Sequence, residues 1–167
     1  PHTIAPGEQG EIDFGYLIPA QTPRYGTIRD ALEIFVDGKS DRTILAAHGI
    51  GIDMPSGTKD RAAKAAISEN MLKFGAVKHD GPIRHLPFEL RNTGGSDLIV
   101  RAVECGEGIG TTLRPGTRIR PGESFSAEAT LDPSQRDYGL LSDHIVLIAN
   151  DPERPMRRLR ITALVEQ

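Results

Sequence analysis

Two stretches of this sequence, about 114 residues apart, carry the same turn and strand landmarks. Three matched landmarks are separated by 115, 113 and 114 residues. Offsets this constant indicate an internal repeat, and a repeat restricts the fold more than any single motif does. The sequence therefore predicts the later part of one domain followed by a complete copy of it. The matched landmarks are Pro6-Gly7-Glu8 with Pro121-Gly122-Glu123, Tyr25-Gly26 with Tyr138-Gly139, and Leu45 with Leu159.

The repeat divides the chain into three parts. Residues 1–52 are expected to form a partial unit made of the last strands of a preceding repeat, and residues 68–167 a complete unit. Residues 53–67 contain Pro55, Gly57 and a run of alanines and charges without a wide apolar face, so we interpret them as a linker. The alternative explanation of the partial unit is that the chain is a truncated or proteolysed form of a longer repeat protein.

Short segments of alternating apolar residues predict the fold class. Leu86, Phe88 and Leu90, for example, fall on one side of an extended strand. With 18 Gly and 12 Pro, turn signals are frequent. About seven strands over roughly 100 residues are typical of an all-β protein, an antiparallel β-sandwich of immunoglobulin type. The predicted strands are 8–18, 31–36, 44–52, 71–77, 83–91, 97–104, 125–131, 143–149 and 159–165.

Composition excludes several classes of function. A net charge of −3 and a pI near 6.0 argue against nucleic acid as a partner, because phosphate binding needs a basic surface. No apolar run of 18 residues is present, so no membrane-spanning segment is expected. The single cysteine, Cys105, excludes an internal disulfide.

A set of spaced motifs resembles one bacterial family. The motifs are Phe74-Gly75, His85-x-Pro-Phe88, Asn92-Thr93-Gly94, Asp97-Leu98-Ile99-Val100, Pro121-Gly122-Glu123, Tyr138-Gly139 and Asn150-Asp151-Pro152. Together they are similar to an immunoglobulin-like domain family of unknown function that is common in Bacteroidetes and related to hydin-type and major sperm protein domains. The resemblance covers Asn70 to Val165. It implies a binding or spacer module without known catalysis, in an exported or lipid-anchored protein and hence in the periplasm or at the cell surface.

The sequence departs from that family at one place. Where the family usually carries Ser-Cys-Gly-Cys-Thr, this chain reads Glu104-Cys105-Gly106-Glu107, so the second cysteine is replaced or displaced. A paired-thiol role in metal binding or redox chemistry is therefore not expected.

Candidate catalytic and metal-binding residues do not form a recognisable set. A reactive Cys105 thiol lacks a base nearby in sequence, so an ordinary loop cysteine is the better interpretation. The glycines of 106–111 resemble a phosphate loop but lack its Gly-Lys-Ser/Thr end. His79, Asp80 and His85 would need a further ligand to bind zinc. We predict no catalytic residue, no cofactor and no metal site.

The expected function is therefore interaction rather than catalysis, for a bacterial cell-envelope protein. Loops at the ends of a sandwich are common binding sites, and β-edges add strands from partners. The candidate interaction residues are Asn92, Thr93, Gly94, Gly95, Cys105, Gly106 and Glu107.

The partial unit predicts a second mode of interaction. About 50 residues of sandwich cannot bury both faces of their strands, and the apolar strand 32–36 would keep unpaired edges. Residues 1–52 are thus expected to dock on the complete unit or to associate with a protein partner or another copy.

The alternative function is an accessory or carbohydrate-binding module of an envelope enzyme. Such a module stacks sugars on exposed aromatic side chains gathered on one face. The sequence has no Trp, and its tyrosines are Tyr16, Tyr25 and Tyr138.

Overall fold

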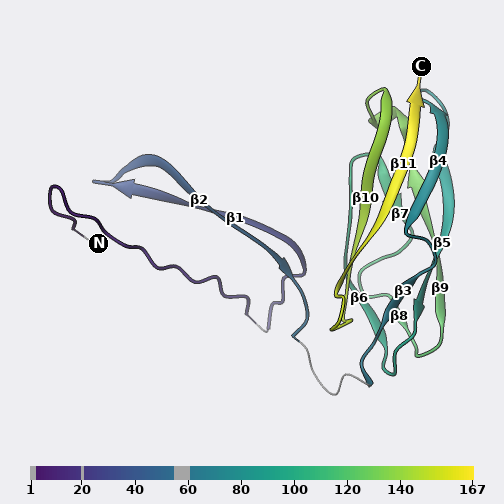
Figure 1. Cartoon of the computed structure of the whole chain (residues 1–167), viewed down its shortest axis with the longest axis horizontal. Coiled ribbons are helices and arrows are strands. Elements are labelled where there is room, and N and C mark those ends of the chain that lie inside the picture. Colours follow the sequence, from purple (N-terminus) through teal and green to yellow (C-terminus); the bar gives the residue numbers. More distant parts are fainter. Residues whose placement is uncertain (1–2, 20, 55–60) are drawn as a thin grey trace.

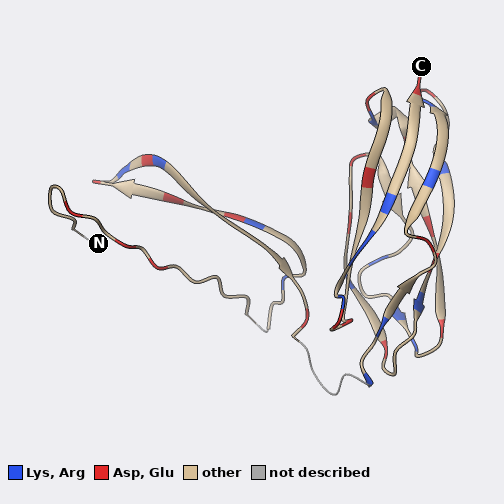
Figure 2. Ribbon diagram, in the orientation of Figure 1, with Lys and Arg blue, Asp and Glu red and all other residues tan. Residues whose placement is uncertain are grey.

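The computed structural model describes residues 3–19, 21–54 and 61–167 (Figure 1). Within these residues the chain forms a two-stranded hairpin, β1–β2, followed by a β-sandwich built from β3 to β11. Figure 2 shows both signs of charge distributed over the two parts. No helix in the described part is long and apolar enough to cross a membrane.

The hairpin consists of β1 (Gly26–Val36) and β2 (Lys39–Gly51). Asp37 and Gly38 connect them with φ angles of 50° and 74°. Two consecutive positive φ values are the mark of a type I′ turn, whose twist matches that of the flanking strands. Asp-Gly is a common sequence for this turn.

The sandwich has two sheets that face each other. One has the strand order β4-β11-β10-β6-β8 and the other β3-β5-β9-β7. The strands are β3 (Ala65–Ile67), β4 (Met71–Lys78), β5 (Arg84–Asn92), β6 (Leu98–Cys105), β7 (Ile109–Thr111), β8 (Arg118–Ile119), β9 (Ser124–Leu131), β10 (Gly139–Ala149) and β11 (Met156–Glu166), with a short 3₁₀ turn, η2 (Pro133–Gln135), between β9 and β10. The immunoglobulin-like sandwich predicted from alternation is confirmed.

The sandwich is not antiparallel throughout. β4 pairs in parallel with β11, whereas every other strand pair in the described sandwich is antiparallel. The chain forms β3 in one sheet and then crosses to the other sheet as β4. This crossing places β4 alongside the last strand with the same direction, which alternation of apolar residues does not reveal.

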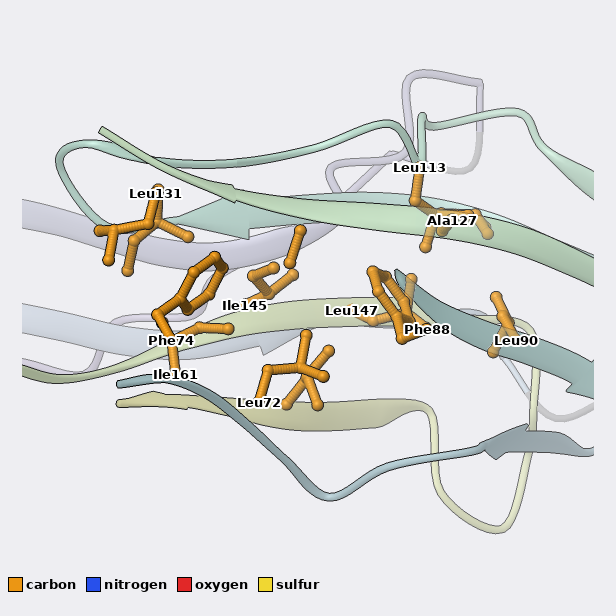
Figure 3. Packing of buried hydrophobic residues seen from close by; sticks show 14 of the residues in the cluster. Leu72, Phe74, Phe88, Leu90, Leu113, Ala127, Leu131, Ile145, Leu147 and Ile161 are labelled. Carbon is orange, nitrogen blue, oxygen red and sulfur yellow. The ribbon is translucent and has the colours of Figure 1, made fainter. Parts of the chain in front are cut away.

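The core lies between the two sheets (Figure 3). Leu90 of β5 and Leu131 of β9 have no exposed surface, and neither has Ile161 of β11 in the opposite sheet. Alternate residues of a strand point to opposite faces, so each strand contributes every second side chain to this layer. Phe88 and Leu90, which are two residues apart on β5, therefore both point into the core.

Two segments differ from their predicted structure. Residues 8–18, expected as a strand, are extended but unpaired. Ala65–Ile67, assigned to the 53–67 linker, is instead strand β3, which pairs with Asn92 to Leu90 of β5. Residues 55–60 of that linker lie outside the described residues. β3 escaped detection because three residues are too few to show alternation.

A buried carboxylate attaches β3 to the sandwich. Asp151, 1% exposed, accepts hydrogen bonds from the backbone N–H of Ala65 at 3.0 Å and from Arg157 Nη2 at 2.9 Å. Burial by itself would raise the pKa of Asp151, but these donors and the N–H groups of Arg154 and Glu153 outweigh it and lower the pKa. The Asn-Asp-Pro motif is therefore a structural anchor here.

Candidate interaction surface

The Pro-Gly-Glu turn has the same local structure in both copies of the repeat. The N–H of Glu8 donates to the carbonyl of Ala5 at 3.0 Å, with Gly7 at a φ of 85°. At the later copy, Glu123 donates to Arg120 at 3.0 Å, with Gly122 at 79°. Pro followed by a positive-φ glycine forms a type II turn, so the shared Pro-Gly-Glu sequence encodes one turn used twice.

The hairpin has the same register as the last two strands of the sandwich from Gly26 to Glu33. β1 and β10 both have 11 residues and both begin at a positive-φ glycine, Gly26 at 90° and Gly139 at 109°. Gly26 pairs with Gly51, and Gly139 pairs with Val165. These registers correspond to offsets of 113 residues for the first strand and 114 for the second, as in the sequence repeat.

The match shows what the hairpin lacks. In the sandwich, β10 also pairs with β6, and β11 also pairs with β4. Among the described residues, β1 and β2 pair only with each other. Leu32 corresponds to Ile145 and is 46% exposed, against 2% for Ile145. Among the described residues, both outer edges of the hairpin and part of its core face therefore have no strand beside them.

The segment before the hairpin is the counterpart of β9. Residues 9–16 follow the Pro-Gly-Glu turn as β9 does, but β9 pairs with β5 and β7, for which this segment has no counterpart among its described neighbours. Without hydrogen-bonding strands it stays unpaired. Phe14 and Tyr16 nevertheless lie over the hairpin, where with Ile28 and Ala47 they line a shallow depression. The segment thus retains part of the layer that β9 forms in the sandwich.

A polar cluster fastens this segment to β1. Arg24 Nη1 lies 2.8 Å from Asp30 Oδ2 and 2.8 Å from the hydroxyl of Tyr16, which itself donates to Asp30. Hydrogen bonds from Tyr16 and then Arg24 lower the pKa of the Asp30 carboxyl. All three groups are solvent-accessible, so the cluster orients the segment more than it stabilises it.

The base of the hairpin contacts the sandwich at β6. Thr27 Oγ1 donates to Glu104 at 2.6 Å, and the Thr27 N–H donates to the same carboxylate. Arg101 forms an ion pair with Asp53 at 2.7 Å and lies over the ring of Tyr25, 5.3 Å from its centroid. The hydroxyl of Tyr25 donates to Asp53, and this bond raises the pKa of Tyr25. These contacts join the base of the hairpin, where β1 begins and the chain leaves β2, to the sandwich.

The predicted loop 92–95 is largely used within the fold. Asn92 is fully buried, and its side chain donates to the carbonyls of Ser96 and Ile119. The N–H of Thr93 donates to Lys64, and a Cβ on Gly94 would lie 2.2 Å from the carbonyl oxygen of Ala62. Thr93 and Gly95 keep exposed surface.

The second predicted loop, 105–107, follows β6, whereas 92–95 precedes it, so β6 separates the two. Cys105 is exposed by surface area, but partial desolvation of its thiol raises its pKa, which keeps it protonated near neutral pH. A Cβ on Gly106 would lie 2.1 Å from Asp143 Oδ2, and the carbonyl of Glu107 accepts from Arg136. The loop surrounds the Arg136–Asp143 ion pair and contains no base for the thiol.

The residues weighed as zinc ligands are engaged separately. His79 stacks on Tyr138 with ring centroids 4.8 Å apart, and His85 Nδ1 lies 3.4 Å from Glu128 Oε2. In the described part of the chain, no three His, Cys, Asp or Glu side chains gather as metal ligands.

The tyrosines weighed for carbohydrate binding also have separate partners. Tyr16 bonds Asp30, Tyr25 bonds Asp53, and Tyr138 stacks on His79 at the other end of the sandwich. They do not form a common stacking face.

The free hairpin was only partly foreseeable. The repeat predicted unpaired edges around 32–36, but the contact of Arg101 and Glu104 with the hairpin joins residues more than 45 positions apart. In the predicted strand 97–104 these two residues fall on opposite sides, so the sequence carried no signal for the contact.

A comparison with known protein families assigns the sandwich to one of them. The model of a family described as "Protein of unknown function (DUF1573)" matches residues 65–165. The chain belongs to this family. The DUF1573 match begins with β3 and ends in β11, so it covers the sandwich and leaves the hairpin outside. Among the curated proteins, none matches the sequence.

Solved structures confirm the fold of this DUF1573 protein. A protein of unknown function from Porphyromonas gingivalis W83 is similar with a TM-score of 0.66 at 22% identity, over 87% of this chain and 68% of that one. The ASH/PapD-like domain 7 of human CEP192 has a TM-score of 0.53 at 12% identity, over 71% of this chain and 96% of that one. At these identities the likeness establishes a PapD-like, immunoglobulin-like sandwich and carries no information on ligands.

Proposed function

We propose that this protein is a non-enzymatic interaction module that binds an extended strand of a protein partner along the free edge of β1. The observation that carries this proposal is that β1–β2 has the register of β10–β11 from Gly26 to Glu33, while among the described residues no strand takes the place of β6 or β4 beside it. A sheet edge with unpaired N–H and C=O groups is a template for strand addition.

The sandwich indicates what a bound strand would look like. β6 pairs antiparallel with β10, placing Cys105 opposite Ile145 and Val103 opposite Leu147. A partner strand in the same position on β1 would run antiparallel, with one residue opposite Leu32 and alternate apolar side chains extending the exposed core face. Backbone hydrogen bonds would supply affinity, and the apolar side chains would supply selectivity.

The contact between Thr27 and Glu104 shows which N–H groups of β1 point away from β2. The N–H of Thr27 donates to Glu104, outside the hairpin, so the N–H of Thr27 points away from β2. Backbone groups of alternate strand residues point to opposite sides. The N–H groups of Arg29, Ala31 and Glu33 therefore also lie on the free edge, and Glu33 still pairs with Ile44 before the register shifts.

The test uses a labelled synthetic peptide with the sequence of residues 97–105, with Ser at the position of Cys105, and the full chain. We expect saturable binding by fluorescence anisotropy. Glu33→Pro removes an edge N–H and places a ring in the path of the strand, so it should weaken binding at least about tenfold. Glu33→Gln, which keeps the N–H, should leave binding unchanged. Absence of binding, or equal binding to the Pro and Gln variants, would refute the proposal.

We also propose a location in the bacterial cell envelope, either periplasmic or at the cell surface. Its support is the sequence resemblance to a domain family found in exported and lipid-anchored proteins. Fractionation of the native bacterium with an antibody against the sandwich tests this, and recovery of the protein in the cytosolic fraction would refute it. The exposed backbone of Thr93 and Gly95 and the loop at Cys105 remain secondary candidates for partner contact.

A further inference from the structure

The two free edges of the hairpin differ in regularity. β1 keeps one continuous register with β2 from Gly26 to Glu33, and the shift comes only between Glu33 and Phe35. β2 contains Arg42 at a φ of 59°, a conformation that non-glycine residues rarely adopt. A regular strand edge pairs more readily than a distorted one, so β1 is the better edge for a partner.

The side chains along this edge are complementary to themselves. When two copies of β1 run antiparallel with Ala31 opposite Ala31, Arg29 of each copy lies opposite Glu33 of the other. Opposite charges at directly facing positions stabilise strand pairs, and like charges destabilise them. If one copy slips by one residue, both Arg29–Glu33 pairs are lost. A slip in one direction places Asp30 opposite Glu33, and a slip in the other direction places Arg29 opposite Leu32.

The same register joins the apolar faces. Residues that face each other across an antiparallel pair lie on the same side of the sheet. With Ala31 on the two-fold axis, Ile28 lies opposite Ile34 of the other copy. Leu32, on the same side, lies opposite Asp30 of the other copy. The result is one four-stranded sheet, β2-β1-β1-β2, whose two half-exposed core faces are continuous.

The contacts of β1 are compatible with this pairing. Thr27 is already hydrogen-bonded to Glu104, so the shared ladder would run from Ile28 to Ile34. Arg29 forms no ion pair with any described residue, which leaves its guanidinium available. Glu33 accepts one hydrogen bond, from the hydroxyl of Ser40, and a charged partner can compete with that bond.

We propose that the partner of the β1 edge is a second copy of this chain, paired antiparallel about Ala31 with reciprocal Arg29–Glu33 ion pairs. The inference rests on the proposed function, since it names the strand that the free edge accepts. The interface is isologous, so every contact occurs twice and a single substitution changes two pairs.

Charge reversal tests the register. Sedimentation equilibrium of the full chain should show a monomer–dimer equilibrium. Arg29→Glu or Glu33→Arg alone sets like charges face to face twice and should raise the dissociation constant at least about tenfold. The double variant Arg29→Glu/Glu33→Arg restores opposite charges and should return the constant to within about threefold of the parent. Arg91→Glu and Glu89→Arg, on the exposed side of β5, are matched controls and should leave it unchanged.

Cross-linking tests the two-fold axis directly. In a Cys105→Ser background, Ala31→Cys should oxidise to a covalent dimer, because facing Cα atoms at about 4.5–5.5 Å suit a disulfide. Ala46→Cys, on the residue that pairs with Ala31 within the hairpin, should not, because it lies one strand farther from the axis.

The outcomes separate this inference from the proposed function. If the chain is monomeric at every concentration but binds the 97–105 peptide, the proposal of a second copy is refuted and the proposal of strand binding is retained. If the chain dimerises but the charge reversals leave its dissociation constant unchanged, or if Ala31→Cys and Ala46→Cys cross-link equally, the proposed register is refuted. A monomer that binds no peptide overturns both proposals.

Discussion

Replacing Asp151 by Asn should destabilise the sandwich strongly, although the two side chains have nearly the same shape. Oδ2 of Asp151 accepts from Ala65 N–H at 3.0 Å and Arg157 Nη2 at 2.9 Å, and Oδ1 accepts from Glu153 at 3.0 Å and Arg154 at 3.1 Å. An asparagine has only one acceptor oxygen. Two of the four donors would therefore face an amide NH₂ inside the protein.

The magnitude follows from these lost bonds. A hydrogen bond to a charged group contributes about 1.5–3 kcal/mol, so two of them amount to about 3–6 kcal/mol. Removing one partner of a buried ion pair costs a similar amount, about 3–5 kcal/mol. Because Arg157 keeps 23% of its side chain exposed and can be partly hydrated, we expect about 3 kcal/mol. Each kcal/mol should lower Tm by about 4–8 °C in a domain of this size.

Urea unfolding followed by far-UV circular dichroism measures the change in the free energy of unfolding. The matched control is Asp97→Asn, because Asp97 pairs with Arg118 at 3.2 Å and both side chains are exposed, at 37% and 65%. Such a surface pair is expected to contribute about 0–1 kcal/mol. Equal losses for the two variants, or a loss below about 1 kcal/mol for Asp151→Asn, would refute the anchoring role of Asp151.

The pH dependence of the same variant provides an independent check. The folded pKa of Asp151 is lower than its ordinary value, so the carboxylate contributes stability that is complete above the ordinary pKa. That contribution is lost as the pH falls through the lowered pKa. The difference between the parent and Asp151→Asn should therefore be constant near neutral pH and shrink below about pH 4. A difference that grows on acidification would contradict this sign.

Three further variants test the junction, the core and a close contact. Arg101→Ala should broaden the distance distribution between spin labels on hairpin and sandwich, yet change sandwich stability by less than about 1 kcal/mol; an unchanged distribution would contradict the junction. Leu131→Ala, at a fully buried site, should cost about 2–5 kcal/mol in urea unfolding, whereas Leu140→Ala, at a 90% exposed site, should cost under about 0.5 kcal/mol. Gly94→Ala should cost about 1–3 kcal/mol because its Cβ would lie 2.2 Å from a backbone oxygen, while Gly49→Ala, with open space, should be nearly neutral; equal effects would contradict the close approach.

Much of the fold could be predicted from local sequence. The Asp37-Gly38 turn, the alternation through Phe88 and Leu90, and the apolar run at 145–148 each specify their own backbone, because turn chemistry and period-two patterning act over a few residues. The repeat likewise predicted that β1–β2 would match β10–β11. The three-residue strands β3 and β7 did not emerge, because they are held by neighbours rather than by their own pattern.

The candidate site was less predictable. Asn92 looked like a surface loop residue, since Asn-Thr-Gly-Gly is a turn sequence, but the fold buries its amide against two carbonyls. The junction of Arg101 and Glu104 with the hairpin depends on segments remote in sequence. Such contacts leave no periodic signal in either segment.

The sequence by itself determined that this chain contains two related units built from short strands and glycine-dependent turns. Only the tertiary structure decided which of those strands are completed. Residues 9–16 and β9 follow the same turn and carry similar alternation, yet β9 has β5 and β7 beside it and 9–16 has no such neighbours among the described residues. A strand needs hydrogen-bonding partners that its own residues cannot supply, and among the described residues the outer edge of β1 has no strand partner either.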